Sequence, residues 1–472
     1  MADKKSPWIQ EMWNVSPFNF ARGALDGLPK RVHIHDTTLR DGISDPARGI
    51  FLNTSERIKI AQALDDLGLK RIEIGLTTES DLNDLKAITG AGLKAKTFLM
   101  TPTVSFGWSD AVTKQGEWKA VDIALKADVS GLVVNFPASE YLIKHYFPTW
   151  TSETMLEKAV SMVAYAKKHG LFVNLFEYDT TRAEPMYLKK LLKAAVIAKA
   201  DTVSIVDTLG VGSPAGTQHL VKLIRNWVKV PVELHMHDDF GLAYANTLAG
   251  VEAGAEVAQT TINGIGKMAA TEDVITSLRI LYGLDTGVKY DRLYGVSKSA
   301  REIGRWTISP YRPISGEFAF GYNSDGRVDE NRSQKAPFLP EFIGHRYRIL
   351  VNKRTGPKGI ASRVEELGRT ATDAQIERIM AELAKTWEKT GQNVNDQEFE
   401  AAVKRVLGVT PTQPLFSFPV SFQAGPLQAT LCLQRQGPYV RPSCAIDSDI
   451  AFRNKWTNVA PGSIAPRLLS PR

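Results

Sequence analysis

Two histidines separated by one residue, His235 and His237, end an apolar run that starts at Val232. If this run is a β-strand, side chains two residues apart point to the same side, so both imidazoles can bind one metal ion. The alternative is a pair of structural histidines whose ring nitrogens are satisfied by backbone carbonyls. Residues elsewhere in the chain must decide between the two.

A second apolar run, residues 32–36, is followed by charged residues that include Arg40 and Asp41, and then by a glycine. A carboxylate can ligate a metal, a guanidinium can clamp an anion, and a glycine permits a tight turn. Asp41 with His235 and His237 makes a three-ligand set that leaves room for water or substrate, and Mg, Mn and Zn all suit it. The alternative is a surface ion pair between Arg40 and Asp41.

Short apolar runs alternate with longer helical patterns over residues 31–284, which is typical of βα units around a parallel sheet. The expected strands are residues 31–36, 71–75, 95–100, 131–136, 171–176, 202–206, 231–236 and 257–263. The expected helices include residues 55–67, 151–169, 185–199 and 214–227. This number of strands in this length predicts an α/β fold, a (β/α)8 TIM barrel, with an open doubly wound sheet as the rival.

Polar residues of catalytic type follow most of these strands, as a barrel with its site at the carboxyl ends of the strands requires. They are Asp36, Arg40 and Asp41 at the first strand, Glu73 in the second, Glu177 to Asp179 at the fifth, Asp207 and Thr208 at the sixth, His235 and His237 at the seventh, and residues 263–266 at the eighth. We therefore expect one barrel mouth with one site.

The length of 472 residues predicts more than one domain. We expect an N-terminal extension (1–30), the catalytic barrel (31–295), helical linker subdomains (296–409) and a tail or small β element (410–472). Helical spacing over residues 372–387 and 396–407, and alternating apolar residues over 427–431, support the last two assignments.

Composition narrows the class of function. Apolar residues make up 43% and charged residues 23% of the chain, as in an ordinary globular protein. No apolar stretch approaches the roughly 20 residues that span a bilayer, and the N-terminus lacks a secretory pattern, so we expect a cytoplasmic protein. The two cysteines, Cys432 and Cys444, exclude a thiolate zinc cluster in the barrel. The net charge of +7 is concentrated after residue 408, so a small anionic substrate is expected rather than nucleic acid.

Three motifs occur in order: residues 36–42 (Asp-Thr-Thr-Leu-Arg-Asp-Gly), residues 206–210 (Val-Asp-Thr-Leu-Gly) and residues 235–241 (His-Met-His-Asp-Asp-Phe-Gly). With them the chain resembles the DRE-TIM metallolyase superfamily, whose HMGL-like barrel is also called the pyruvate carboxyltransferase domain. Isopropylmalate synthase, homocitrate synthase, Re-type citrate synthase and hydroxymethylglutaryl-CoA (HMG-CoA) lyase belong to it. Residues 312–320 and 343–356 are similar to the linker subdomains of the synthases, whereas the lyases end near the barrel.

The resemblance favours condensation over cleavage. Lyases of this superfamily carry a catalytic cysteine on the loop after the eighth strand, and residues 264–273 contain none. The carboxyltransferase branch places a carboxylated lysine next to the position of Asp207, where this chain has Val206, so biotin chemistry is not expected. The implied activity is an acyltransferase reaction that condenses an acyl-CoA, acetyl-CoA above all, with a 2-oxo acid. The implied assembly is a homodimer.

The resemblance also implies roles for individual residues. The metal bound by Asp41, His235 and His237 would chelate the oxo acid, Arg40 would neutralise the developing alkoxide, and Thr208 would bind the substrate carboxylate. Two further residues have open alternatives. Glu177 is the candidate acid or base on the fifth strand, or a salt-bridge partner of Arg182, and Asp36 either orients Arg40 or is purely structural.

Departures from the family pattern leave other positions open. The asparagine that ends the family's loop after the eighth strand is missing, and Thr271 is our candidate for the fourth metal ligand, with Glu272 or water as alternatives. Ile43 and Ser44 replace a Glu-Gln pair of the synthases. Arg327 replaces their linker histidine, with Tyr322 nearby, and these four positions are expected to contact the substrate.

Two other functions stay open. One is a lyase or aldolase that runs the same metal-dependent chemistry in reverse. The other is a catalytically silent subunit that acts in binding or assembly.

Overall fold

The computed structural model describes residues 12–21, 23, 25–44, 49–102, 119–322 and 337–408, and the backbone of three strands beyond them. Within these residues the chain forms two compact units, of which the first ends at Arg348 and the second begins at Ile349. None of the described helices is both long and apolar enough to cross a membrane.

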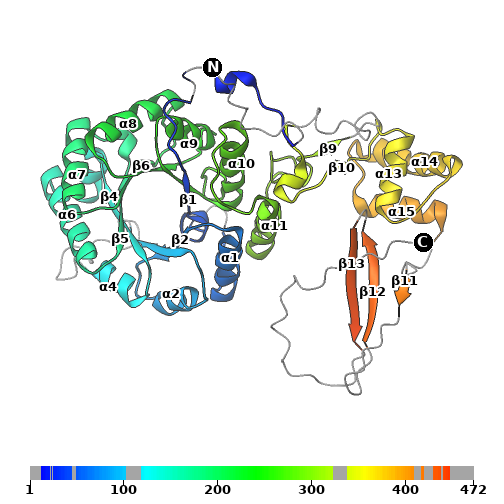
Figure 1. Cartoon of the computed structure of the whole chain (residues 1–472), viewed down its shortest axis with the longest axis horizontal. Coiled ribbons are helices and arrows are strands. Elements are labelled where there is room, and N and C mark those ends of the chain that lie inside the picture. Colours follow the sequence, from blue (N-terminus) through cyan, green and yellow to red (C-terminus); the bar gives the residue numbers. More distant parts are fainter. Residues whose placement is uncertain are drawn as a thin grey trace, which may run out of the picture. The chain divides into compact units, whose positions relative to one another are not determined.

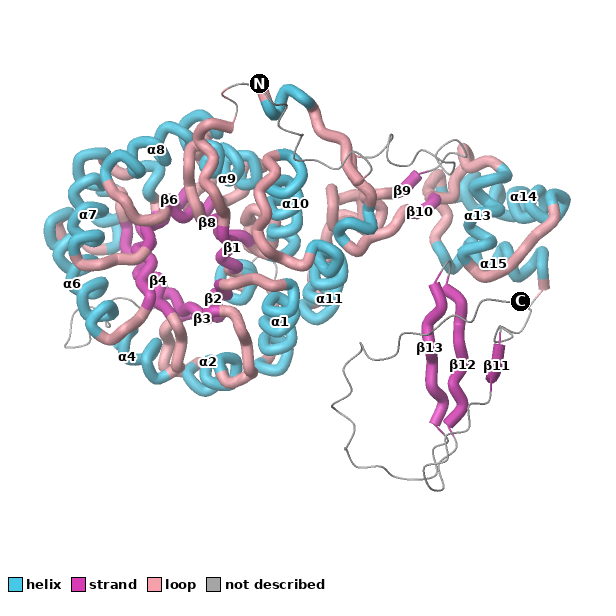
Figure 2. The backbone as a smooth tube through the Cα atoms, viewed as in Figure 1, coloured by secondary structure: helices cyan, strands magenta, loops and turns pink. Residues whose placement is uncertain are grey.

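The first unit is a closed barrel of eight parallel strands in sequential order (Figures 1 and 2). The last strand pairs with the first, with His33 opposite Val257, so the open-sheet alternative is excluded and the predicted TIM barrel is confirmed. The strands are β1 (His33–Asp36), β2 (Arg71–Leu76), β3 (Lys96–Met100), β4 (Gly131–Pro137), β5 (Phe172–Tyr178), β6 (Thr202–Asp207), β7 (Val232–Met236) and β8 (Val257–Thr260).

Helices surround the strands, as the ring of cyan tubes in Figure 2 shows. They are α1 (Thr54–Leu67), α2 (Leu82–Thr89), α4 (Lys119–Lys126), α5 (Glu140–Tyr146), α6 (Ser152–Lys168), α7 (Pro185–Ile197), α8 (Pro214–Trp227), α9 (Ala243–Glu252), α10 (Thr271–Leu281) and α11 (Leu293–Gly304). Their starts follow from local chemistry: Asn53 and Glu56 form a capping box on α1, and Ser213 caps α8 before Pro214.

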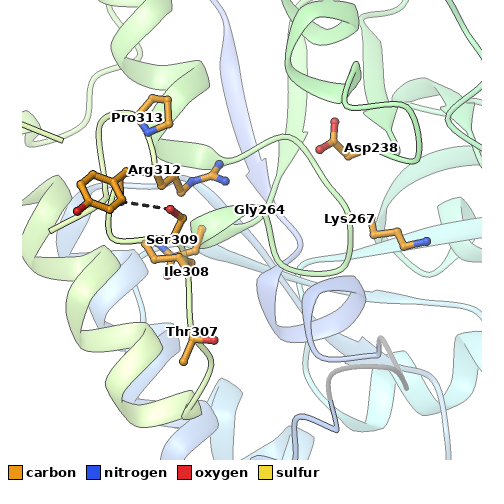
Figure 3. Close-up of a pocket in the computed structure, with 10 residues that line it drawn as sticks. Asp238, Gly264, Lys267, Thr307, Ile308, Ser309, Arg312 and Pro313 are labelled. Atoms are coloured by element: carbon orange, nitrogen blue, oxygen red, sulfur yellow. Dashed lines mark hydrogen bonds between the residues drawn. The ribbon is translucent and has the colours of Figure 1, made fainter. Parts of the chain in front are cut away.

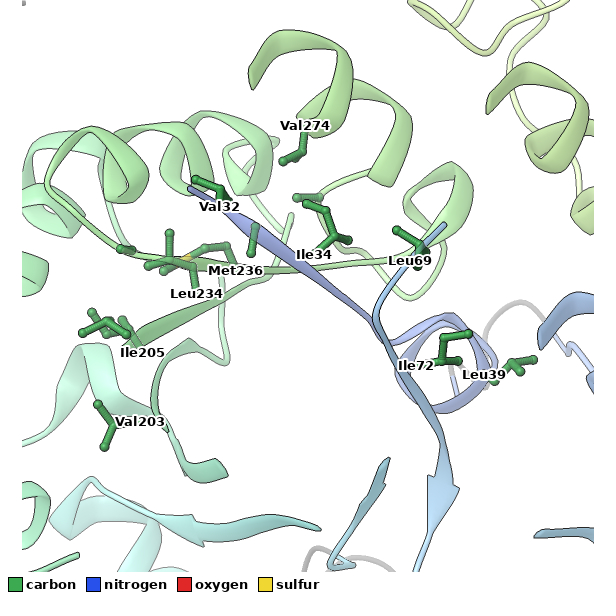
Figure 4. Packing of buried hydrophobic residues seen from close by; sticks show 14 of the residues in the cluster. Val32, Ile34, Leu39, Leu69, Ile72, Val203, Ile205, Leu234, Met236 and Val274 are labelled. Carbon is green, nitrogen blue, oxygen red and sulfur yellow. The ribbon is translucent and has the colours of Figure 1, made fainter. Parts of the chain in front are cut away.

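Alternation along the strands separates two apolar layers. Side chains such as Ile34, Ile72 and Ile205 face the helices and form the main core, part of which Figure 4 shows. A smaller cluster, formed by Phe98, Met100, Val133, Phe176 and Val206, alternates with that layer and fills part of the barrel interior.

Two local differences from the expected elements lie next to the candidate site. β8 ends at Thr260 instead of residue 263, because Asn263 adopts a positive φ of 61° that a strand does not accommodate. After β1 the chain turns at once through a single π-helical turn, Thr38–Gly42, which contains Arg40 and Asp41. This turn places both side chains at the mouth of the barrel.

The second unit contains α13 (Pro357–Glu366), α14 (Asp373–Thr390) and α15 (Asp396–Leu407), which share a core that includes Ile360, Ile379 and Phe399. The helical C-terminal region is therefore as predicted. Two short strands, β9 (Gly321–Tyr322) and β10 (Arg348–Ile349), precede these helices. Three antiparallel strands follow them: β11 (Phe416–Phe418), β12 (Ala429–Gln436) and β13 (Tyr439–Ile446).

Candidate metal and substrate site

The three predicted metal ligands converge at the mouth of the barrel. Oδ2 of Asp41 lies 3.2 Å from Nε2 of His235 and 3.4 Å from Nε2 of His237, and the two Nε2 atoms are 3.2 Å apart. Oδ2 is buried and has no hydrogen-bond partner among the described residues. Three donor atoms of this kind, within 4.8 Å of one another, fit a shared divalent cation.

The charge states of Asp41 and His235 also suit a metal. Burial alone would raise the pKa of Asp41, but Arg40 and the two imidazoles hold that pKa well below its usual value, so the carboxylate is ionised. Burial lowers the pKa of His235, which leaves its ring neutral at pH 7. An ionised carboxylate and a neutral imidazole are the protonation states that ligate a metal.

Gln259 of β8 sets the tautomer of His235. Nδ1 of His235 lies 2.8 Å from Oε1 of Gln259, an atom that can only accept a hydrogen bond. The orientation of the amide is set in turn, because its Nε2 donates to Oε2 of Glu233 at 2.9 Å. Nδ1 of His235 therefore carries the proton, and the lone pair of Nε2 faces Asp41.

Glu233 holds Gln259, and through it His235, by contacts on the side of the ligands away from the mouth of the barrel. Its carboxylate also contacts Nδ1 of His35 at 3.1 Å and accepts from Arg71 and Thr202 at 2.9 and 2.7 Å. Burial alone would raise the pKa of Glu233, but these neighbours lower that pKa to about 2. A permanent buried carboxylate thus fixes Gln259, and through it the ring of His235.

Arg40 is held by two carboxylates. Its Nε and Nη2 donate to the two oxygens of Glu73 at 2.9 and 3.0 Å, and Nη1 lies 2.8 Å from Oδ1 of Asp41. The guanidinium also lies 5.7 Å from the ring centre of Phe176. The side chain of Arg40 is only 6% exposed, so the expected alternative of a surface ion pair does not describe this contact.

Two glycines permit the close approach of the loops around the ligands. A Cβ on Gly266, where φ is +72°, would lie 2.6 Å from the carbonyl oxygen of Asp41. A Cβ on Gly210, where φ is +61°, would lie 2.8 Å from the backbone nitrogen of Asp239 and 3.0 Å from the carbonyl oxygen of His237. Both backbones can take these positions only because no side chain intervenes.

Asp36 does not supply the contact that the sequence predicted. Its oxygens accept from the backbone nitrogen and the hydroxyl of Thr38, both at 2.9 Å, so it stabilises the turn after β1. Glu73 and Asp41 make the contacts that orient Arg40. The prediction that Asp36 orients Arg40 is corrected, because β1 directs Asp36 away from the barrel interior, toward the layer that contains Ile34.

Glu177 lies in a different environment from the metal ligands. It is fully buried, and both of its carboxylate oxygens lack a hydrogen-bond partner among the described residues. Burial raises its pKa well above the usual value. The predicted alternative, a salt bridge between Glu177 and Arg182, is wrong, because Arg182 donates to both oxygens of Asp179 at 2.7 and 2.8 Å.

Two threonines predicted to act in the site have defined partners. The hydroxyl oxygen of Thr208 accepts from the backbone nitrogen of Asp179 at 2.8 Å, which leaves its proton available to another acceptor. The hydroxyl of Thr271 lies fully buried, 2.8 Å from that of Thr260. The alternative ligand Glu272 accepts from the backbone and side-chain nitrogens of Asn263 at 3.0 and 2.6 Å.

The predicted substrate-contacting residues are described only in part. Ile43 is half-buried and packs against the main core, and the hydroxyl of Ser44 donates to the carbonyl oxygen of Asp41 at 2.9 Å. Both therefore lie beside the ligand group. The side chain of Tyr322 and all of Arg327 lie outside the described residues.

A pocket of about 520 Å³ has Asp238, the residue after His237, in its wall (Figure 3). Asp238 and Lys267 line one side, and residues 307–309 and 311–313 line the other. Lys267 pairs with Asp239 at 2.8 Å, and Arg312 pairs with Asp273 at 2.9 Å. The wall of the pocket is thus largely polar and charged.

Glu73, Glu233 and Gln259 complete the site. The sequence analysis placed Glu73 among the polar strand residues without a specific role, and did not identify Glu233 or Gln259. For Glu233 a signal was available, because it lies two residues before His235 and must face the same side of the strand. Gln259 is a polar residue in a fully buried strand, but its contact with His235 depends on the register between β7 and β8.

Comparisons with known proteins identify the family of the chain. Residues 31–299 match the model of the family described as HMGL-like. The chain is 36% identical to the homocitrate synthase of Methanothermobacter thermautotrophicus over 402 residues, 84% of this chain and 98% of that protein. It is 35% identical to the (R)-citramalate synthase of Methanocaldococcus jannaschii over 80% of this chain and 75% of that protein. The 2-isopropylmalate synthase of the same organism is also 35% identical, over 82% and 74%.

Solved structures agree on the fold. The crystal structure of the hydroxymethylglutaryl-CoA lyase from Pseudomonas aeruginosa aligns with a TM-score of 0.51 at 20% identity, and covers 60% of this chain and 95% of that chain.

Proposed function

The chain belongs to the HMGL-like family, and we propose on that basis that it catalyses a Claisen-type condensation of an acyl-CoA with a 2-oxo acid. The acyl donor we propose is acetyl-CoA. Water then hydrolyses the thioester of the condensation product, so the products are CoA and a 2-hydroxy-2-alkyl di- or tricarboxylic acid. The observation that carries the proposal is the convergence of Asp41, His235 and His237 beside Arg40, in a chain whose relatives are named as synthases of this kind.

Asp41, His235 and His237 would hold a divalent cation, Mg, Mn or Zn. When bound, such an ion supplies Lewis-acid polarisation of the carbonyl of the oxo acid. Gln259 and Glu233 keep the His235 ring in the tautomer that directs Nε2 to this position. The fourth ligand that we propose is Thr271, or a water in its place.

The remaining residues act on the charge of the substrate. Arg40, fixed by Glu73, places a guanidinium beside the ligand group, where it offsets negative charge that develops on the former carbonyl oxygen. Thr208 already accepts a hydrogen bond through its oxygen, so its proton can be donated to the substrate carboxylate. Ile43 and Ser44, which follow Asp41 in the chain, would contact the oxo acid.

We further propose that the enzyme is a cytoplasmic homodimer. The family resemblance supports this assembly, with Tyr322 and Arg327 of the linker as substrate contacts. Light scattering of the purified chain tests the assembly, because a monomer mass at micromolar concentration would contradict it.

The activity is tested by thiol release from the purified full chain. The protein is stripped of metal, reloaded with Mg²⁺, Mn²⁺ or Zn²⁺, and mixed with acetyl-CoA and one of pyruvate, oxaloacetate, 2-oxoisovalerate or 2-oxoglutarate. We expect metal-dependent release of free CoA with at least one oxo acid, above the rate without an oxo acid. No release with any member of the panel would refute the proposal, and no thermal stabilisation by any of the three ions would favour the silent subunit.

A further inference from the structure

Strand β5 sends alternate side chains to opposite sides of the barrel wall. Phe172, Phe176 and Tyr178 belong to the interior cluster, whereas Val173 and Leu175 belong to the core between strands and helices. Side chains two residues apart share a side, so Glu177 follows Val173 and Leu175 outward. The residue that ends β5 on the interior side is Tyr178.

The electrostatic surroundings of Glu177 agree with this direction. The buried hydroxyl of Tyr187, on α7, is influenced electrostatically by Glu177, and that helix belongs to the outer ring. Both side chains are without hydrogen-bond partners among the described residues. Glu177 therefore lies in the helix layer, away from the metal ligands.

Tyr178 lies on the side of the ligand group. Phe176, its neighbour on the interior side, is 4.9 Å from His235 between ring centres and 5.7 Å from the guanidinium carbon of Arg40. Tyr178 lies about 7 Å further toward the carboxyl end of the strand. In a TIM barrel this is the direction of the mouth, where substrates bind.

The hydroxyl of Tyr178 is buried and has no hydrogen-bond partner among the described residues. Buried polar groups are normally hydrogen-bonded, and one that is not calls for an explanation. Burial also raises the pKa of this phenol, so it stays protonated and can donate a hydrogen bond.

We propose that Tyr178, rather than Glu177, is the residue of strand five that contacts the substrate, and that its neutral hydroxyl donates a hydrogen bond to an oxygen of the 2-oxo acid. This inference rests on the proposed function for the identity of the substrate. It gives Tyr178 the role of a donor and not of a base.

The test compares Tyr178→Phe with Tyr187→Phe in the full chain. Each change removes one buried hydroxyl that has no hydrogen-bond partner among the described residues. The Tyr178 hydroxyl lies on the interior side, and the Tyr187 hydroxyl lies in the helix layer. We expect Tyr178→Phe to lower kcat/KM 10- to 100-fold, and to weaken oxo acid binding to the Mn²⁺-loaded protein at least tenfold by calorimetry. Mn²⁺ affinity and the thermal midpoint should be unchanged, which separates substrate contact from a structural role, and Tyr187→Phe should leave all four quantities unchanged.

Two results would overturn the inference. One is an unchanged kcat/KM and oxo acid affinity in Tyr178→Phe. The other is a loss of more than 100-fold in Glu177→Gln while Tyr178→Phe retains activity. Failure of the proposed function is distinguishable, because wild type would then release no CoA with any oxo acid. In that case the oxo acid affinities of wild type and Tyr178→Phe, measured by calorimetry, still test the inference. Wild type that binds none of the oxo acids would also overturn it.

Discussion

Gln259 offers a sharp test of how the site is built, because it touches a ligand without being one. In Gln259→Leu, Nδ1 of His235 loses the acceptor that now lies at 2.8 Å, and Glu233 loses a donor at 2.9 Å. Glu233 keeps His35, Arg71 and Thr202 as partners, so the loss falls mainly on His235. The ring is then free to rotate or to change tautomer.

The expected magnitude follows from these contacts. Loss of the partner that orients a metal-binding histidine typically weakens metal binding by about 10- to 100-fold. In free energy this corresponds to about 1.4 to 2.7 kcal/mol. The buried Nδ1–H left without an acceptor should further reduce the free energy of unfolding by about 1 to 3 kcal/mol.

The assay is a calorimetric titration of the metal-free chain with Mn²⁺, at a temperature well below its unfolding. Ser204→Ala is the matched control, because the Ser204 hydroxyl lies in the same interior, donates to Oδ1 of Asn174 at 2.9 Å and receives only a 3.4 Å contact from Gln259. We expect its Mn²⁺ affinity to stay within about twofold of wild type. A folded Gln259→Leu variant with wild-type affinity for Mn²⁺ would refute the reasoning.

Three further predictions concern single positions. His235→Ala should abolish turnover. It should also lower Mn²⁺ affinity by more than the roughly 100-fold expected when a residue that only orients a ligand is removed. His219→Ala, at an exposed position of α8, should change neither turnover nor Mn²⁺ affinity. Glu73→Gln breaks the bidentate contact with Arg40 and should lower kcat/KM by about 10- to 100-fold while Mn²⁺ affinity changes little; equal losses in both would indicate a general disruption. Burial raises the pKa of Asp273 from 3.8 to about 7. The unfolded chain therefore releases this proton at lower pH than the folded chain, and stability falls as pH rises from about 4 to 7, by at most about 4 kcal/mol. Urea unfolding at pH 5 and pH 8 should show a smaller drop for Asp273→Asn than for wild type, and equal drops would contradict the assignment.

Much of the barrel and of the metal ligand set could be predicted from the sequence. Apolar runs separated by helical patterns are local features, and most strands begin and end within two residues of the predicted positions. His235 and His237 were linked by the two-residue period of a strand, which is also local. Asp41 joined them because the carboxyl ends of all barrel strands meet at one mouth.

The structure alone decided which neighbours support these ligands. Gln259 reaches His235 across 24 residues and Glu73 reaches Arg40 across 33, and neither contact follows from spacing along the chain. Both depend on the register of neighbouring strands, β7 with β8 for the first contact and β1 with β2 for the second. No pattern within one strand contains that information.

The side-chain directions in strand β5 show the same difference between what the sequence determines and what the tertiary structure determines. The sequence by itself determined that a strand with polar residues ends near residue 178, and the type of the carboxyl group made Glu177 the natural candidate. Which of two successive side chains faces the mouth depends on the direction of the pleat, and packing sets that direction. In this barrel the aromatic residues Phe172 and Phe176 occupy the interior side, so Tyr178 faces the mouth and Glu177 faces the helices.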